Sequence, residues 1–210
     1  MNKILETFWE DYTTDPYPIN RRMKVLNEIR GMSTENICLL FNELVRIHAK
    51  GGTYLEVGTF WGRSVLSAAL YNPSTRCITI DNFSQFGGSF GNLQKGLDRF
   101  NLPNIEFYNL DYKDAIAQIF EKEPDLKVDV YFYDGDHAYQ HQVNGLNIML
   151  PYLADNCVIL VDDYNLEHVR QANDEFKAAN PGFESVLRIR TPRNADRTWW
   201  NGIEVLMRYS

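Results

Sequence analysis

The sequence predicts an α/β fold, with a doubly wound, Rossmann-like, mostly parallel seven-stranded sheet and helices on both faces. Three observations carry this prediction. From residue 53 onward, short apolar runs alternate with helical runs, which is typical of parallel βαβ units. The first of these runs, 53–57, leads directly into a turn that contains Gly58 and Gly62. The last two strand-like runs have no helix between them, so we expect an antiparallel hairpin at the end of the sheet.

The elements follow in order. Helices are expected at 4–9 and 19–29, and a third runs to residue 49 from a capping Ser33 or Thr34, because its apolar residues have helical spacing. The predicted parallel strands are 53–57, 77–80, 105–109, 128–133 and 158–161. The predicted helices between and after them are 62–71, a run after the 83–91 loop that ends at residue 100, 113–121, 139–150 and 166–179. Strands 185–190 and 203–208 form the hairpin.

Length and composition limit the organisation and the function. The 210 residues predict one domain over 51–210, preceded by a helical extension or cap over 1–50. A net charge of −7 argues against nonspecific nucleic-acid binding, which needs an excess of Lys and Arg. No apolar run reaches 18 residues and no signal peptide is present, so neither a membrane span nor secretion is predicted. Cys38, Cys77 and Cys157 are odd in number and widely spaced, which predicts free thiols and a cytoplasmic protein.

The glycine turn after the first strand predicts a ligand site. Gly58 and Gly62 lack a Cβ, so the backbone can approach a ligand, and the following helix start offers unpaired N–H groups. Glu56 at the strand end repels phosphate and attracts a cation. The turn therefore favours a sulfonium-bearing, amino-acid-like cofactor over a dinucleotide, although a plain strand-to-helix turn is the simpler alternative.

The pattern Glu-x-Gly-x-x-x-Gly resembles the first motif of class I S-adenosylmethionine-dependent methyltransferases. Asp81 lies 23 residues after Gly58, where an acid accepts both ribose hydroxyls, and the resemblance places the adenine beside Asp111. Turn formation by Asp81 and Asn82, and helix capping by Asp111 and Ser64, are the alternatives. The predicted S-adenosylmethionine site consists of Glu56, Gly58, Thr59, Gly62, Ser64, Asp81, Asn82, Asp111, Tyr112 and Asp134.

Acidic residues follow two strands that we expect to be neighbours. One strand ends in Asp134-Gly135-Asp136-His137, and the next ends in Asp162-Asp163. Carboxylates gathered across one cleft repel one another, and a hard divalent cation such as Mg²⁺ would relieve that conflict. Successive strand side chains point to opposite faces, so Asp162 and Asp163 reach one ion only if the chain has left the strand. Otherwise Asp163 is expected to pair with Arg63 or Arg170, and Asp136 to cap the next helix or contact the cofactor.

The Asp-Gly-Asp-His-x-Tyr and Asp-Asp-Tyr runs resemble metal-dependent small-molecule O-methyltransferases, in particular the macrocin-type sugar branch. This resemblance implies a metal site at Asp134, Asp162 and Asp163, with His137 as the catalytic base. A His that is neutral at pH 7 can take the proton of an acceptor hydroxyl. The expected function is S-adenosylmethionine-dependent, metal-assisted O-methylation of a small sugar or phenolic acceptor. A metal-independent methyltransferase with His137 as base and a silent cofactor-binding module are the alternatives, and a homo-oligomer stays open.

Two loops are expected near this site. The 83–91 loop combines glycines with phenylalanines, which is typical of a mobile cover. The loop at 191–201 carries Trp199 and Trp200, which either flank the acceptor, pack under the hairpin or form a dimer contact.

Overall fold

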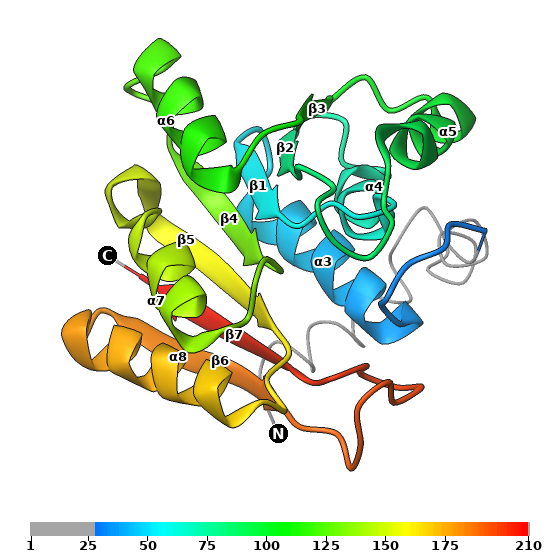
Figure 1. Ribbon diagram of the computed structural model, residues 1–210. Coiled ribbons are helices and arrows are strands. Elements are labelled where there is room, and N and C mark those ends of the chain that lie inside the picture. The colour runs from blue at the N-terminus through cyan, green and yellow to red at the C-terminus, as the bar shows by residue number, and fades with distance from the viewer. Residues whose placement is uncertain (1–27, 210) are drawn as a thin grey trace.

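The computed structural model describes residues 28–209 and has the predicted sheet (Figure 1). The strand order is β3-β2-β1-β4-β5-β7-β6. The first five strands pair in parallel, and β7 pairs antiparallel with both β5 and β6. The strands are β1 (Thr53–Val57), β2 (Arg76–Ile80), β3 (Ile105–Tyr108), β4 (Val128–Tyr133), β5 (Leu153–Asp162), β6 (Phe183–Ile189) and β7 (Ile203–Arg208). The terminal hairpin is thus confirmed.

Helices cover both faces of this sheet, as Figure 1 shows. The helices are α3 (Glu35–His48), α4 (Arg63–Ala69), α5 (Phe90–Phe100), α6 (Tyr112–Lys122), α7 (Tyr139–Asn147) and α8 (Glu167–Ala179). The predicted helix at 4–9 and most of the one at 19–29 lie outside the described residues, and residues 28–29 are not helical. No helix between residues 28 and 209 has the length and apolar character needed to cross a bilayer.

Two hydrophobic cores lie on opposite faces of the sheet because strand side chains alternate. On one face, α3, α4 and α5 pack over alternate strand residues such as Tyr54 and Phe132. On the other face, α6, α7 and α8 pack over their neighbours, such as Leu55 and Tyr133. Every residue of β1 is buried, as expected for a central strand covered on both faces. Cys38, Cys77 and Cys157 are free and buried, as predicted.

The strand β5 is longer than the sequence predicts. It begins at Leu153, five residues before the expected start at Val158. The sequence prediction missed these first residues because they include the polar stretch Asp155-Asn156, which precedes the buried apolar run. Those polar residues are exposed, so hydrophobic periodicity does not detect them as strand. The other predicted strands and helices between residues 34 and 208 differ from the observed ones by at most a few residues at their ends.

Candidate active site

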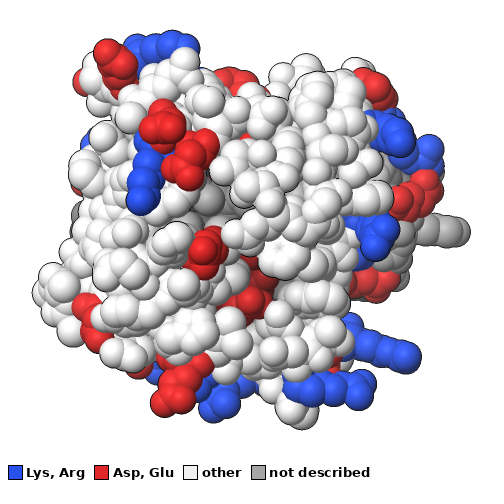
Figure 2. Space-filling view, in the orientation of Figure 1, with Lys and Arg blue, Asp and Glu red and all other residues white. Residues whose placement is uncertain are grey.

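A cavity of about 440 Å³ opens at the carboxyl ends of the parallel strands, where ligands bind in open α/β sheets. Its size is in the range of small-molecule sites. The cavity brings together most of the predicted residues. Those that line it are Gly58, Asp81, Asn82, Asp111, Tyr112, Asp134, His137, Asp162 and Asp163. In Figure 2, carboxylates lie in a hollow near the centre of this face.

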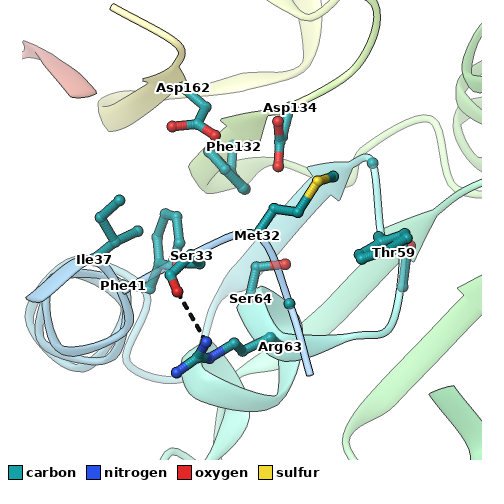
Figure 3. Close-up of a pocket in the computed structure, with 13 residues that line it drawn as sticks. Met32, Ser33, Ile37, Phe41, Thr59, Arg63, Ser64, Phe132, Asp134 and Asp162 are labelled. Atoms are coloured by element: carbon teal, nitrogen blue, oxygen red, sulfur yellow. Dashed lines mark hydrogen bonds between the residues drawn. The ribbon is translucent and has the colours of Figure 1, made fainter. Parts of the chain in front are cut away.

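A smaller cavity of about 40 Å³ adjoins the large one, and both share Met32, Gly58 and Asp134 in their walls. The predicted residues Thr59 and Ser64 line this smaller space (Figure 3). Residues 31–33 also line it, and the backbone carbonyl of Ser33 accepts a 2.8 Å hydrogen bond from Nη1 of Arg63 (Figure 3). The segment that precedes α3 is therefore part of the wall of the site.

The glycine turn has a different physical basis from the one that the sequence suggests. Gly58 has φ +98°, and a Cβ built on it would lie 2.0 Å from the carbonyl oxygen of Asp134. Gly62 has φ +87°, and its Cβ would lie 2.5 Å from Cδ1 of Leu93. Glycine is required at both positions because other residues of the protein, and not a ligand, occupy the space that a Cβ would need. Gly62 begins α4 as its N-cap and lines neither cavity.

Glu56 lies beneath the site and does not line it. Its side chain is fully buried, with Oε2 accepting from the Tyr54 hydroxyl at 2.6 Å and Oε1 accepting from Ser64 at 3.1 Å and Thr79 at 2.7 Å. Burial raises the pKa of Glu56 to about 8, although the three hydroxyl donors oppose that shift. Ser64 is thus engaged with Glu56, and the hydroxyl of Thr59 contacts that of Thr79.

Asp81 holds two loops at the rim of the cavity. Its Oδ2 accepts from the backbone N–H of Phe60, and its Oδ1 accepts from that of Phe83, both at 2.7 Å. Asn82 makes a similar turn, in which its Oδ1 accepts from the Ser84 N–H at 3.0 Å. The turn-forming alternative for these residues is therefore observed, but each carboxylate oxygen of Asp81 keeps a second lone pair for a ligand.

Asp111 and Tyr112 lie at the start of α6. Asp111 is the N-cap of this helix, and its Oδ1 accepts from the Lys113 N–H at 3.0 Å. Both residues also line the large cavity. The Tyr112 hydroxyl is buried and has no hydrogen-bond partner among residues 28–209. Capping and a place in the wall are thus compatible at Asp111.

His137 lies among the acidic residues of β4 and β5. Its Nε2 is 3.3 Å from Oδ1 of Asp134 and 3.7 Å from Oδ2 of Asp163. Asp163 also accepts a 2.6 Å hydrogen bond from Nδ2 of Asn201. Its φ of +56° shows that the chain has left β5 at this residue, which is the condition under which the side chains of Asp162 and Asp163 could face one ion. Arg170 instead donates to the backbone carbonyls of Tyr164 and Asn165.

The acidic cluster sets the charge of His137. Burial lowers the pKa of His137, but the hydrogen bond to Asp134 and the negative charges of Asp134, Asp163 and Asp162 outweigh it and raise the pKa to about 9. Burial and the neighbouring acids also raise the pKa values of Asp134 and Asp162. The expectation that His137 is neutral at pH 7 is therefore wrong, because its acidic neighbours stabilise the imidazolium.

The predicted metal ligands converge only in part. Within residues 28–209, no group of three or more His, Cys, Asp and Glu side chains is placed to hold a metal ion. Oδ1 of Asp162 is nevertheless buried and has no hydrogen-bond partner in the part of the chain that the structure describes. Asp136 turns away to His141, whose Nδ1 is 3.0 Å from its Oδ2, and accepts from the Ala138 N–H at the start of α7.

Several residues of the site carry no signal in the sequence. Met32 and Phe60 line both cavities. Phe86, which is 75% exposed, lines the large one from the 83–91 loop that the sequence predicts near the site. Met32 comes from a segment before α3 that no periodic pattern links to the sheet. Trp200 borders the large cavity and also packs against the core, and Trp199 packs against the core alone, so the structure realises two of the alternatives for this loop. The sequence analysis also missed His141, which lines the cavity from the first turn of α7.

Known proteins resemble this chain in sequence and in fold. The model of a family described as a methyltransferase domain matches residues 55–164. Uncharacterized protein R132 of Acanthamoeba polyphaga mimivirus is 34% identical over 116 residues, which are 53% of this chain and 51% of that protein. The chain thus matches about half the length of this curated relative.

Two solved structures illustrate the likeness in fold. The O-methyltransferase TomG of Streptomyces achromogenes, involved in tomaymycin synthesis and solved with S-adenosylmethionine, has a TM-score of 0.68 at 16% identity, over 93% of this chain and 91% of TomG. CalS11, a TDP-rhamnose 3′-O-methyltransferase of calicheamicin biosynthesis, has a TM-score of 0.63 at 16% identity, over 99% of this chain and 94% of CalS11.

Proposed function

This chain belongs to the methyltransferase domain family, and from that premise we propose that it transfers the methyl group of S-adenosylmethionine to a hydroxyl oxygen of a small acceptor. The observation that carries the proposal is one cavity whose wall contains two different sets of polar side chains. Asp81 and Asp111 line one region, and His137 with Asp134 and Asp163 lines the other. A nucleoside fits the first region, and an acceptor hydroxyl needs a base such as the one in the second.

The cofactor assignment rests on the acids at the ends of β2 and β3. The carboxylate of Asp81 can accept both ribose hydroxyls with the lone pairs that its backbone donors leave open. Asp111 and Tyr112 line the same cavity, and in this proposal the carboxylate of Asp111 accepts from the adenine amino group. Glu56 is buried under the turn and lines neither cavity, so it is not part of this assignment. The fold neighbour TomG, solved with S-adenosylmethionine, supports the same assignment.

The base in this proposal is Nε2 of His137. The bound cofactor supplies an electrophilic methyl group on a cationic sulfur. The acceptor oxygen forms the new C–O bond as the C–S bond breaks, the bonding pair stays on sulfur, and the hydroxyl proton goes to Nε2. Because the pKa of His137 is about 9, the imidazole must first lose its own proton. Asp134 and Asp163 then stabilise the imidazolium that forms again during transfer.

The acceptor in this proposal is a sugar or phenolic compound. The wall near His137 mixes aromatic and hydrogen-bonding groups, including Phe60, Trp200 and Asn201. Such a mixture suits a hydroxylated ring. CalS11, which shares the fold, is a TDP-rhamnose 3′-O-methyltransferase, and this supports a sugar as the first acceptor to assay.

The test combines binding with turnover. We expect S-adenosylhomocysteine to bind in titration calorimetry, and we expect methyl transfer from S-adenosylmethionine to at least one member of a panel of sugar and catechol acceptors. The variant His137→Gln should keep its affinity for S-adenosylhomocysteine and lose about 100-fold or more of its turnover, which is typical for a general base. Full turnover in this variant would remove the base role, and binding without turnover in wild type would identify a silent cofactor-binding module.

A second question within the proposal is whether a divalent metal ion assists the methyl transfer. The donor types suit Mg²⁺, since they are carboxylates, and Asp162 offers a buried oxygen with no partner among the described residues. Their placement does not form a ligand group within residues 28–209, and Nε2 of His137 approaches both Asp134 and Asp163. We therefore assign no step to a metal. Loss of turnover in EDTA with recovery in Mg²⁺ would establish the metal-assisted reaction, and full turnover in EDTA would establish the metal-independent one.

The N-terminal extension is proposed to act as a cap of the domain over 51–210. Met32 and Ser33 line the small cavity, and Oγ1 of Thr34 donates a 2.7 Å hydrogen bond to the carbonyl of Thr198 in the hairpin loop. These contacts support a role for the segment before α3 in enclosing the ligand.

A further inference from the structure

The tryptophan near the end of the hairpin loop, Trp200, has an unusual backbone conformation in the wall of the large cavity. Its φ is +51°, in the left-handed region that bulky residues rarely adopt. Within residues 28–209, eight residues other than glycine have a positive φ, and half of them line this cavity: Phe60, Phe86, Asp163 and Trp200. Such conformations are costly and cluster where a site needs a particular side-chain placement.

Hydrogen bonds of the hairpin loop hold Trp200 in this conformation. Its N–H donates to the carbonyl of Asp196 and its carbonyl accepts from the N–H of Asp196, both at 3.0 Å. The same carbonyl also accepts from Oγ1 of Thr191 at 3.0 Å. Oγ1 of Thr34 donates to the carbonyl of Thr198 at 2.7 Å, which ties the loop to the start of α3. The position of the indole is therefore fixed by the protein itself.

The next residue, Asn201, connects this loop to the acidic side chains near the proposed base. Its Oδ1 accepts from the N–H of Ala195 at 2.7 Å, and its Nδ2 donates to Oδ1 of Asp163 at 2.6 Å. A backbone N–H only donates, so the orientation of this amide group is fixed. Oδ2 of the same Asp163 lies 3.7 Å from Nε2 of His137. Trp200 therefore lies next to the part of the cavity where the proposed methyl transfer takes place.

The order of the strands places Trp200 away from the proposed nucleoside region. Trp200 lies just before β7, which pairs with β5, whereas Asp81 follows β2 and Asp111 follows β3. The strands β1, β4 and β5 lie between β2 and β7 in the sheet. A ligand group that contacts Trp200 therefore belongs to the acceptor and not to the adenosine.

The neighbouring Trp199 shows what a structural tryptophan does in the same loop. Both indoles are half-buried and pack against the core on the face of the sheet that α3 covers. Trp200 also lines the large cavity, whereas Trp199 lines neither cavity. An indole in a cavity wall offers a large, flat apolar surface to a ligand ring. Core packing accounts for Trp199 and does not account for the place of Trp200.

We propose that Trp200 is the specificity-determining residue of the acceptor site and that it selects acceptors whose methylated hydroxyl is carried by a ring. The face of a phenol ring, or the apolar C–H face of a sugar ring, covers the indole while the hydroxyl faces His137. This inference rests on the proposed function, because it assumes that the cavity holds a hydroxylated acceptor. An indole that is fixed in advance needs little ordering when the ring binds. An acyclic alcohol has no such face and gains little from Trp200.

The first test compares ring acceptors with an acyclic one. Catechol and methyl rhamnoside are the ring probes, and ethylene glycol is the acyclic probe with the same pair of adjacent hydroxyls. In Trp200→Leu, we expect kcat/KM for a ring probe to fall about threefold to tenfold, the range for one aromatic contact. Trp200→Phe keeps an aromatic ring and should retain most of this kcat/KM. The Kd for S-adenosylhomocysteine should stay within about twofold in both variants.

Two outcomes of this comparison contradict the proposal. One is an unchanged kcat/KM for the ring probes in Trp200→Leu. The other is methylation of ethylene glycol by wild type with the same kcat/KM as the ring probes, because the site would then not select for a ring.

The matched control is Trp199→Leu, the same exchange one residue away in the same loop. We expect this variant to lower Tm in thermal unfolding, since Trp199 packs against the core. Its kcat/KM for the ring probes should stay within about twofold of wild type. If Trp199→Leu and Trp200→Leu lower kcat/KM equally, the integrity of the loop explains both effects and the proposal is wrong.

A binding test separates this inference from the proposed function. Each ring probe is titrated in the presence of S-adenosylhomocysteine, and indole fluorescence reports a ring that stacks on Trp200. We expect the emission to change in wild type and in Trp199→Phe, and to stay constant in Trp200→Phe. Such binding without methylation would contradict the proposed function and leave the assignment of Trp200 intact. Methylation of a ring probe with an emission change that persists in Trp200→Phe, or no emission change in wild type, would overturn the assignment.

Discussion

At the scale of single residues, the site depends on carboxyl groups that the protein surrounds with its own donors. Glu56 is the clearest case, because it is fully buried and contacts the hydroxyls of Tyr54, Ser64 and Thr79. Hydroxyl groups can donate or accept, so this arrangement can satisfy both the protonated and the ionised form of the carboxyl group. Burial decides between the forms and favours the protonated one up to a pH of about 8.

The raised pKa of Glu56 predicts a pH-dependent contribution to stability. The pKa is about 8 in the folded protein and 4.5 without its surroundings, so the folded state binds the proton more tightly. The contribution is fully present below pH 4.5 and is lost as pH rises to 8. In urea unfolding at several pH values, the free energy of unfolding of wild type relative to Glu56→Gln should fall across this window. A difference that is constant with pH would contradict a buried protonated carboxyl group.

Because Gly58 has no Cβ, the chain after β1 can lie close to the chain after β4. Its φ is +98°, and its Cβ position lies 2.0 Å from the carbonyl oxygen of Asp134. The variant Gly58→Ala should lose more than the about 1–3 kcal/mol of backbone strain at such a φ, because Asp134 must also move. Gly51→Ala is the control, since Gly51 has φ +76° and no atom within 4 Å of its Cβ position. Equal losses in urea unfolding would show that strain alone explains Gly58.

At the scale of elements, residues just after the strands connect one strand end to the next. Asp81 follows β2 and accepts from the backbone of Phe60 in the β1–α4 turn and of Phe83 in the loop before α5. Asp111 follows β3 and begins α6. The same carboxylates that cap turns and helices therefore also line the cavity, so capping and binding are not competing interpretations of these residues.

This double role predicts the effect of Asp81→Asn. The amide keeps one acceptor oxygen, and its NH₂ group faces one of the two backbone N–H groups that the carboxylate now receives. We expect the Kd for S-adenosylhomocysteine to rise about tenfold to a hundredfold, which corresponds to the about 1.5–3 kcal/mol typical of a hydrogen bond to a charged group. Calorimetry measures this change. Unchanged affinity, with a folded protein by circular dichroism, would show that Asp81 serves the loops alone.

At the scale of the whole molecule, hydrophobic periodicity predicted the sheet and its final hairpin because those features depend on local pattern and chain order. The acids at Asp81, Asp134 and Asp162 were predictable for the same reason, since strand ends meet at one edge. The place of Met32 in the cavity wall was not predictable, because the residues that share this wall lie far from it in the sequence. The charge of His137 and its contact with Gln142 were not either, since both depend on which side chains surround the imidazole.

The distribution of the site over many strand ends predicts that a bound nucleoside stabilises the whole fold. The cavity wall draws residues from the ends of β1, β2, β4 and β5 and from the segment before α3. A ligand that binds only the folded state at 100 times its Kd adds about 2.7 kcal/mol to the free energy of unfolding. For a chain of this size, each kcal/mol shifts Tm by about 2–4 °C, so S-adenosylhomocysteine should raise Tm by about 5–10 °C. At the same ligand concentration Asp81→Asn should show a smaller shift, because its Kd is higher. A Tm that does not respond in wild type would mean that the cavity does not bind this nucleoside.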